Sequence, residues 1–380
     1  MKKFLFQLLV FSSPLLVYLV YPSYVLWKSE ENFHQIDATI SSKEKYLFGY
    51  NYNENNYGYI KWRYLNDNEK KTVWALGSSR VLQFRENMFD KSFYNAGYTL
   101  GKINDFRPFL NSIPKSKYPD YMIINLDQWM FNEAFDDLRT KASSTVWEKS
   151  FTFFPKIVPT YNTIYSEAFN NSKNSENTIE TASPYRKIGM NAKRNNTGFR
   201  NDGSMFYGKQ IKNLIDKNPE AEDFNYAETF IRIRKGSSRF EYGDSINERA
   251  FVELNELLKF CQENKIKVIA FLPPFADKVY DRMETSTNYG YLKNMHKKIK
   301  PFFDNYNFEV YDFSKMSLCN SNDNETIDGF HGSETTYQRM LISMLNSGSV
   351  LNKVTSLERL KTDLANRKNN YVVYDDEKTD

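Results

Sequence analysis

Short apolar runs alternate with amphipathic segments in two parts of the chain, before residue 131 and after residue 246. Five runs have the length and composition of buried strands, at residues 72–76, 92–95, 121–126, 267–272 and 308–313. Apolar residues at helical spacing occupy residues 100–113, 288–303 and a segment from about residue 333. Strands that alternate with helices predict an α/β domain with a parallel sheet of about five strands.

Between these two parts, at about residues 131–246, the pattern is lost. Asn- and Ser-rich segments separate short aromatic ones there. Such a stretch is too long for a plain loop, so we expect an insertion that carries helices of its own or forms a cap facing the substrate. The α/β domain is therefore predicted to cover residues 72–380 and to contain this insertion.

The N-terminus carries an apolar run of a different kind. Lys2 and Lys3 precede a mostly apolar stretch at residues 4–27, and Glu30 and Glu31 follow it. About 20 apolar residues span a bilayer, and basic residues before the span favour a cytoplasmic N-terminus. This pattern predicts a single-pass membrane protein whose domain lies outside the cytoplasm, in the periplasm or at the cell surface.

Residues 1–27 are therefore expected to form a membrane anchor, and residues 28–71 a stalk and N-terminal extension. A cleaved signal peptide is the alternative, and two prolines inside the run, Pro14 and Pro22, argue against a regular helix. No small-x-small cleavage site closes the run, which favours the uncleaved anchor.

Composition adds mainly exclusions. The chain has 380 residues, of which 41% are hydrophobic, enough for a sizeable core and unlike a disordered protein. The net charge of +4 is small, and no dense Lys/Arg run is interleaved with aromatics, so we expect no nucleic-acid partner. The two cysteines, Cys261 and Cys319, form no disulfide framework. No spacing is typical of a metal site, and no cofactor is expected.

A strand that runs into Gly-Ser-Ser is the first candidate for chemistry. Residues 73–76 are Val-Trp-Ala-Leu, and Gly77, Ser78 and Ser79 lead into an amphipathic segment. The pattern predicts a buried strand, a tight turn and a helix start. A serine there lies at the carboxyl edge of the sheet, with backbone N–H groups aimed at an oxyanion. A capped helix without chemistry is the alternative.

One of the three histidines has a setting suited to catalysis. His331 follows the last predicted strand, precedes a helix, and has Asp328 three residues before it. In such a turn the carboxylate accepts the imidazole Nδ1–H and leaves Nε2 to take a proton from a serine. His34 lies in the polar stalk and His296 in a Lys-rich helix, where a solvated surface position is expected.

These motifs resemble the blocks of the SGNH/GDSL hydrolase superfamily. Gly77-Ser78-Ser79-Arg80 matches the first block, with Ser in place of the usual Asp, and Asp328-Gly329-Phe330-His331 matches the last. Residues 95–101 look like the second block. The resemblance covers roughly residues 72–128 and 248–345. It implies a three-layer, flavodoxin-like SGNH hydrolase fold and a catalytic triad of Ser79, His331 and Asp328.

The resemblance also implies an oxyanion hole, formed by the N–H groups of Ser79 and Gly97 and by a side-chain amide. The third block, Gly-x-Asn-Asp in the family, fits poorly, because this chain has Asn125-Leu126-Asp127-Gln128 there. Asn125 is the first candidate for the amide donor and Gln128 the second. Arg80 and Gln128 are weak candidates for substrate binding, and an ion pair that pins the helix start is the alternative for Arg80.

A membrane anchor combined with this first block points to a subgroup of the superfamily. It resembles the membrane-anchored proteins that work with membrane-bound O-acyltransferases on surface polymers, such as those of alginate O-acetylation and teichoic acid D-alanylation. The resemblance implies an extracytoplasmic serine O-acyltransferase or esterase that acts on a cell-surface polysaccharide through an acyl-serine intermediate. Its partners would be that glycan and a membrane-bound O-acyltransferase. A non-catalytic accessory protein that binds the acyltransferase or the polymer is the alternative.

Overall fold

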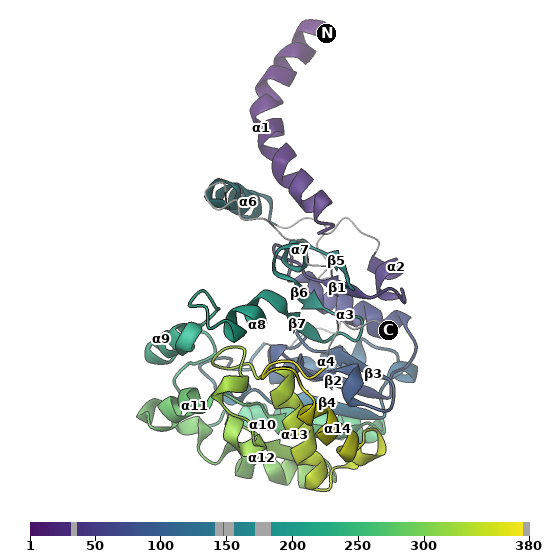
Figure 1. Ribbon diagram of the computed structural model, residues 1–380, viewed down its shortest axis with the longest axis vertical. Helices are drawn as coiled ribbons and strands as arrows, with labels where there is room; N and C mark the ends of the chain where they lie inside the picture. Colours follow the sequence, from purple (N-terminus) through teal and green to yellow (C-terminus); the bar gives the residue numbers. More distant parts are fainter. Residues whose placement is uncertain (32–35, 141–146, 148–155, 172–183, 375–380) are drawn as a thin grey trace.

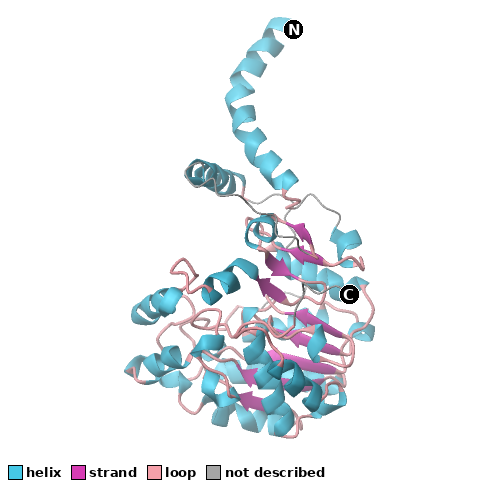
Figure 2. Cartoon of the chain, in the orientation of Figure 1, coloured by secondary structure: helices cyan, strands magenta, loops and turns pink. Residues whose placement is uncertain are grey.

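The computed structural model describes residues 1–31, 36–140, 147, 156–171 and 184–374. Its main part is an α/β body, from which the long helix α1 (Lys2–Lys28) projects (Figure 1). Strands run through the body in two sets, a larger one among helices and a smaller one nearer to α1 (Figure 2). The predicted α/β class is therefore confirmed.

The larger sheet has five strands, all parallel, in the order β3-β2-β4-β8-β9. Their bounds are β2 (Val73–Leu76), β3 (Phe93–Ala96), β4 (Tyr121–Asn125), β8 (Lys267–Leu272) and β9 (Glu309–Asp312). This confirms the predicted parallel sheet, and β8 has the bounds expected from the sequence. Strand order reverses at β2, which lies between β3 and β4. Ligands of open α/β sheets bind at the carboxyl ends of strands at such a reversal.

Successive residues of each strand face two separate apolar cores. In β2, Trp74 and Leu76 belong to one core, and Val73 and Ala75 to the other. Helices that contribute to the first core are α3 (Asn56–Asp67), α4 (Phe106–Asn111), α10 (Glu248–Glu263), α11 (Asp277–Glu284) and α12 (Met295–Asp304). The second core is covered by α13 (Glu334–Asn346) and α14 (Leu357–Ala365). Both faces of the sheet are thus buried, which explains its continuously apolar strands.

The two cysteines are divided between these cores. Cys261 is buried in the first core and Cys319 in the second, and both are free thiols. They therefore lie on opposite faces of the sheet and form no disulfide with each other.

A second, four-stranded sheet has the order β5-β1-β6-β7. Strand β1 (Tyr46–Phe48) comes from the N-terminal extension, and the other three strands, β5 (Arg186–Ile188), β6 (Thr197–Phe199) and β7 (Met205–Tyr207), come from the insertion. Strand β1 pairs with β5 and β6, and β7 pairs with β6. The sequence analysis did not predict this sheet, because three-residue strands show no periodicity. The extension also contains α2 (Ile36–Ile40) and α3, so most of its described residues pack on the body.

The described part of the insertion has helices of its own, as expected for a stretch of this length. They are α6 (Ile157–Asn171), α7 (Met190–Asn195), α8 (Gly208–Ile215) and α9 (Ala227–Lys235). Helix α6 lies apart from the body, beside α1, whereas α8 and α9 lie over it (Figure 1).

The prediction of a regular helix directly after Ser79 is wrong. The segment forms two short 3-10 turns instead, Ser79–Val81 and Glu86–Met88. The side-chain amide of Asn95 in β3 donates to the carbonyl oxygens of Val81 (2.8 Å) and Phe84 (2.9 Å). The Val81 carbonyl also accepts the N–H of Phe84 at 3.2 Å, as in a single 3-10 turn, and the Asn95 side chain takes the place of the bonds that a longer helix would make.

Helix α1 is the one helix of the described chain that is long and apolar enough to cross a membrane. Pro14 and Pro22 lie within it without ending it.

The C-terminal end of α1 is attached to the body through Glu31. The carboxylate of this residue is fully buried and accepts the backbone N–H groups of Asn51, Tyr52, Asn53 and Met190. The helix is thus fixed to both the N-terminal extension and the insertion.

Candidate active site

Ser79 stands at the carboxyl end of β2, directly beyond a turn that depends on glycine. Gly77 has a φ of +151°, and a Cβ there would lie 1.8 Å from Asn125 Oδ1. Only glycine fits this close approach. Ser78 then caps the 3-10 turn, because its Oγ accepts the Arg80 N–H at 3.1 Å. As a result Ser79 becomes the first residue of the turn and its hydroxyl remains partly exposed.

The structure brings together the three residues predicted as a triad. Ser79 Oγ lies 2.8 Å from His331 Nε2, and His331 Nδ1 lies 2.7 Å from Asp328 Oδ2. The other carboxylate oxygen, Oδ1, accepts the N–H groups of Phe330 and His331, each at 2.8 Å. Asp328 thus fixes both the backbone of its own loop and the imidazole ring. The arrangement is that of a serine nucleophile, a base and an orienting acid.

The carboxyl of Asp328 is held in its ionised form. Burial alone would raise its pKa, but the charge interaction with His331, its hydrogen bond and the two backbone N–H groups hold the pKa below its usual range. Ionised Asp328 accepts a hydrogen bond from Nδ1–H, which fixes the tautomer when the imidazole carries one proton. The lone pair of Nε2 then faces the Ser79 hydroxyl and is able to accept its proton.

The groups predicted to line an oxyanion hole are beside the turn, but two of them are bound inside the protein. The Gly97 N–H donates to Asn95 Oδ1 at 2.9 Å. Asn125 is fully buried, where its Oδ1 accepts the Ser78 N–H (3.1 Å) and its Nδ2 donates to Ser78 Oγ (2.9 Å). The N–H of Ser79 is at the start of a helical turn, where no acceptor exists within the turn. The oxyanion hole stays a prediction.

Arg80 and Gln128 take supporting positions in place of the substrate contacts predicted for them. The Arg80 side chain is fully buried between the rings of Trp129 and Phe275. It donates to Gln128 Oε1 (3.0 Å) and to the Pro273 carbonyl (2.8 Å). Gln128 is 1% exposed and donates to the same carbonyl. Neither side chain reaches the cavity that contains Ser79, so the ion-pair alternative for Arg80 describes its position.

The partner of Arg80 is a buried carboxylate that the sequence analysis did not single out. Asp127 is fully buried, with an oxygen 3.5 Å from Arg80 Nη1. Burial raises its pKa, and the charge of Arg80 and the Ser78 hydroxyl oppose this effect. Its position two residues after β4 could have identified it in the sequence, because polar residues that follow a buried strand lie at the carboxyl edge of the sheet, where ligands bind.

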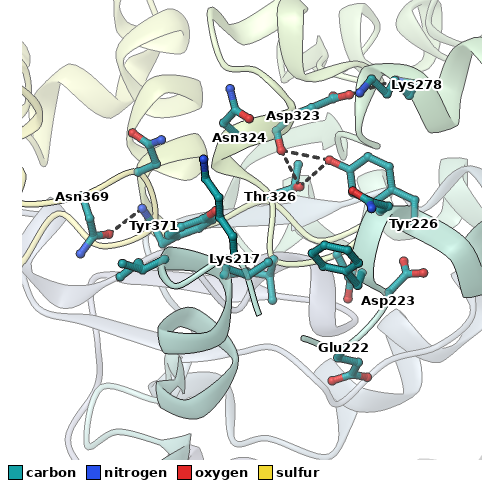
Figure 3. Close-up of a pocket in the computed structure, with 17 residues that line it drawn as sticks. Lys217, Glu222, Asp223, Tyr226, Lys278, Asp323, Asn324, Thr326, Asn369 and Tyr371 are labelled. Atoms are coloured by element: carbon teal, nitrogen blue, oxygen red, sulfur yellow. Dashed lines mark hydrogen bonds between the residues drawn. The ribbon is translucent and has the colours of Figure 1, made fainter. Parts of the chain in front are cut away.

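The loop of Asp328 and His331 is held from outside by the insertion. Asp223 Oδ2 accepts the Gly329 N–H at 3.0 Å and the Thr229 hydroxyl at 2.6 Å. Gln210 Nε2 donates to the Ile327 carbonyl at 2.9 Å. The hydroxyl of Tyr226 donates to the Asp323 carbonyl at 3.0 Å (Figure 3). Sequence reasoning missed these residues, because the insertion shows no pattern that relates it to the last strand.

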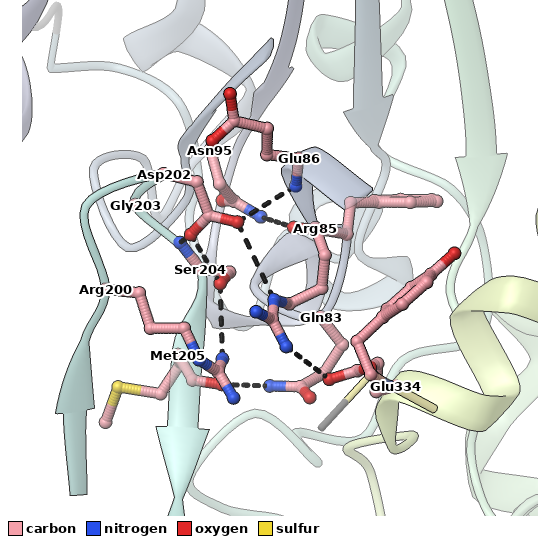
Figure 4. Close-up of polar contacts among 12 residues, drawn as sticks. Gln83, Arg85, Glu86, Asn95, Arg200, Asp202, Gly203, Ser204, Met205 and Glu334 are labelled. Carbon is pink, nitrogen blue, oxygen red and sulfur yellow. Dashed lines mark hydrogen bonds and ion pairs between the residues drawn. The ribbon is translucent and has the colours of Figure 1, made fainter. Parts of the chain in front are cut away.

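A buried ionic cluster links the segment after Ser79 to the helix after His331 (Figure 4). Arg85 lies between Glu334, the first residue of α13, at 3.0 Å and Asp202 of the insertion at 3.6 Å. Burial raises the pKa of Asp202, but Arg85, Arg200 and the Ser204 hydroxyl hold it below its usual range. The segment after Ser79, the insertion and α13 are therefore joined by charged side chains in the protein interior.

One cavity opens onto this site, and a second lies beside it. One, of about 490 Å³, is lined by Ser79 and His331 together with side chains of the insertion such as Tyr207, Arg232 and Arg239. The other, of about 850 Å³, lies along the same loop and is lined by Tyr226 and Tyr371 among mostly polar residues (Figure 3). Glu222, Asp223 and Asp328 line both. The two cavities therefore lie side by side along the loop.

No protein-family model matches this chain, and no curated protein is significantly similar to it. Function is therefore inferred from the geometry of the site.

Proposed function

We propose that this protein is an extracytoplasmic serine esterase or O-acyltransferase of SGNH type. The observation that carries the proposal is the chain of hydrogen bonds from Ser79 Oγ to His331 Nε2 (2.8 Å) and from His331 Nδ1 to Asp328 (2.7 Å). The order β3-β2-β4-β8-β9 adds support. In sequence order it reads 2-1-3-4-5, the order of flavodoxin-like sheets.

In the proposed reaction Ser79 Oγ attacks the carbonyl carbon of an ester while His331 Nε2 takes the hydroxyl proton. Asp328 stabilises the imidazolium that forms. The alcohol leaves with that proton, and an acyl-serine remains. The hydroxyl of a sugar, or of water, then attacks the acyl carbon with His331 again as base. The oxyanion of each intermediate would meet the N–H of Ser79, where removal of one donor typically costs about 3 kcal/mol.

We infer that the acyl acceptor is a polysaccharide at the cell surface. Both cavities are lined mainly by polar and charged residues, and the larger has the rings of Tyr226 and Tyr371 among amide and charged side chains. Aromatic rings with hydrogen-bonding groups suit the faces and hydroxyls of sugars. The apolar N-terminal helix supports a membrane-anchored enzyme whose acyl donor is supplied by a membrane-bound O-acyltransferase.

A non-catalytic accessory role is the second candidate, and one observation favours it. The Gly97 N–H and the Asn125 amide are engaged with Asn95 and Ser78, which leaves fewer donors for an oxyanion. A fluorophosphonate probe separates the two roles, because it reacts only with an activated serine. We expect stoichiometric labelling of the wild-type chain and of Ser78→Ala, and none of Ser79→Ala. An unlabelled but folded wild-type protein would support the accessory role.

The topology is tested separately. Alkaline phosphatase fused after the last residue should be active in a bacterial host, because that enzyme needs the oxidising exterior to form its disulfides. Fluorescence of a cytoplasmic reporter fused at the same position would contradict the proposed orientation.

A further inference from the structure

Helix α6 (Ile157–Asn171) packs on the projecting helix α1 (Figure 1). Its buried residues Tyr161 and Ile164 form a small apolar cluster with Leu26 of α1, separate from the two cores of the body. A helix that belongs to the insertion is thereby brought against the N-terminal helix, more than 130 residues away in the sequence.

The contacts fix α6 beside a defined part of α1. The Tyr165 hydroxyl donates to the Tyr18 carbonyl at 3.0 Å, and their rings stack with centroids 5.6 Å apart. The Tyr18 hydroxyl donates to Asn162 Oδ1 at 2.9 Å, and the hydroxyls of Ser23 and Tyr161 are 2.9 Å apart. All these α1 residues lie between positions 17 and 23.

This part of α1 has a predictable depth if the helix spans a bilayer. Helical rise is about 1.5 Å per residue, so positions 17 to 23 lie roughly 6 to 15 Å along the axis from Trp27. The hydrocarbon core is about 30 Å thick and takes about 20 residues. With Leu26 and Glu31 buried against the protein, the contact zone falls in the outer half of the span. A helix held there cannot lie in bulk water.

The surface of α6 is consistent with that depth. Ile157 is 45% exposed and Val158 61% exposed, although both are apolar. The helix contains no Lys or Arg, and its one charged residue, Glu167, lies near its end. Glu167 pairs with Arg194 at 2.6 Å and accepts the Tyr52 hydroxyl at 2.6 Å, both on the body side. The exposed beginning of α6 is thus apolar, whereas its charge faces the protein.

We propose that α6 is an interfacial membrane helix, seated at the boundary of headgroups and acyl chains in the outer leaflet. The occupant of its apolar face is lipid. The proposal rests on α1 as a membrane anchor but not on the chemistry at Ser79. Together α1 and α6 would give the protein two contacts with the bilayer, one spanning and one lying along its surface.

Site-directed spin labelling of the full chain in phospholipid nanodiscs tests this proposal. Val158→Cys and Val252→Cys form a matched pair, because both valines are 61% exposed and Val252 lies on α10 of the body. The native thiols should not react, since both are buried and burial raises the pKa of Cys319 to about 12. Val10→Cys, within α1, reports on the anchor.

We expect the label at position 158 to collide more with oxygen, which concentrates in lipid, than with a water-soluble nickel chelate. The label at position 252 should show the reverse preference. A nickel preference at position 158 with an oxygen preference at position 10 would overturn the proposal for α6 alone. A nickel preference at position 10 would overturn the anchor and the proposal with it.

Discussion

The two halves of the candidate triad are held by different parts of the molecule. The turn of Ser79 is fixed from beneath by fully buried groups at the carboxyl edge of the main sheet, namely Arg80, Asn125 and Asp127. The loop of His331 is fixed from its outer side by Asp223 and by two other residues of the insertion. One support is part of the core, and the other is a docked segment with partly exposed side chains.

This difference separates stability from activity. A group inside the core that loses its partner is left unsatisfied, which destabilises the whole fold. A contact between the insertion and the loop contributes less to the fold, but it sets where the imidazole stands relative to the hydroxyl. Catalysis is sensitive to displacements of about 1 Å. Substitutions beneath Ser79 should therefore lower stability, and substitutions around His331 should lower turnover.

The largest effect is expected where the two halves meet. Ser79→Ala or His331→Ala should each reduce turnover of an activated ester by about 10⁴-fold or more, and the double variant should lose little beyond either. The reason is that the triad acts as one unit. Steady-state rates measure the loss, and circular dichroism checks the fold. Wild-type turnover in Ser79→Ala would exclude an acyl-serine intermediate. The two supports would then have no common catalytic function to compare.

Beneath the turn, Arg80→Met should lower the free energy of unfolding by about 3 to 5 kcal/mol, because Asp127 is left buried without its cation. Thermal unfolding in detergent measures this loss. Adding Asp127→Asn should restore part of it, since the unpaired charge is then removed. KM for a small ester should stay unchanged in both variants. A raised KM at normal stability would instead support a role of Arg80 in substrate binding.

Around the loop, Asp223→Ala should lower kcat by about 10- to 100-fold, the equivalent of 1.5 to 3 kcal/mol for a charged hydrogen bond. KM should not change, because Asp223 acts through Gly329 and positions the loop. Asp223→Asn keeps an acceptor oxygen and should recover most of the rate. Asp216→Ala, an exposed carboxylate in the same insertion, is the control. Equal losses in stability for Asp223→Ala and Arg80→Met would contradict the proposed difference between the support of the Ser79 turn and the support of the His331 loop.

The smallest effect is expected at Ser78. Its hydroxyl accepts the Arg80 N–H and the Asn125 amide, so Ser78→Ala should cost about 1 kcal/mol of stability and about fivefold in turnover. Unfolding and initial-rate measurements on the same preparation compare the loss of stability with the loss of turnover. A loss as large as that of Ser79→Ala would mean that the hydroxyl of Ser78 takes part in the chemistry.

Much of the main sheet was predictable, because buried parallel strands appear in the sequence as continuous apolar runs of about four to eight residues. The run at residues 267–272 is an example. The proximity of Ser79 and His331 was predictable for a related reason, since both follow strands and parallel strands share one carboxyl edge. The second sheet was not predictable, because β1 and β5 are three residues long and 137 residues separate Phe48 from Arg186.

Two local predictions were limited by tertiary contacts. The amphipathic pattern after Ser79 was correct about burial but wrong about helix, because the Asn95 side chain binds the carbonyls of Val81 and Phe84. Asn125 has the residue type of an oxyanion donor, yet its amide closes the space that Gly77 leaves open. Neither contact has a signature in the neighbouring sequence, since each depends on which strands become neighbours.

The contacts of the Glu31 carboxylate limit the motion of the candidate active site relative to helix α1. A flexible tether would let Ser79 sample many heights above a membrane, with an effective concentration that falls as the tether lengthens. Here four backbone N–H groups bind that carboxylate at the foot of α1, and Gly189 donates to the carbonyl of Ser29. If α1 spans a membrane as proposed, the domain is held at one fixed distance from it. A substrate carried by the bilayer would be met at that height, and a long polymer would have to move past a stationary site.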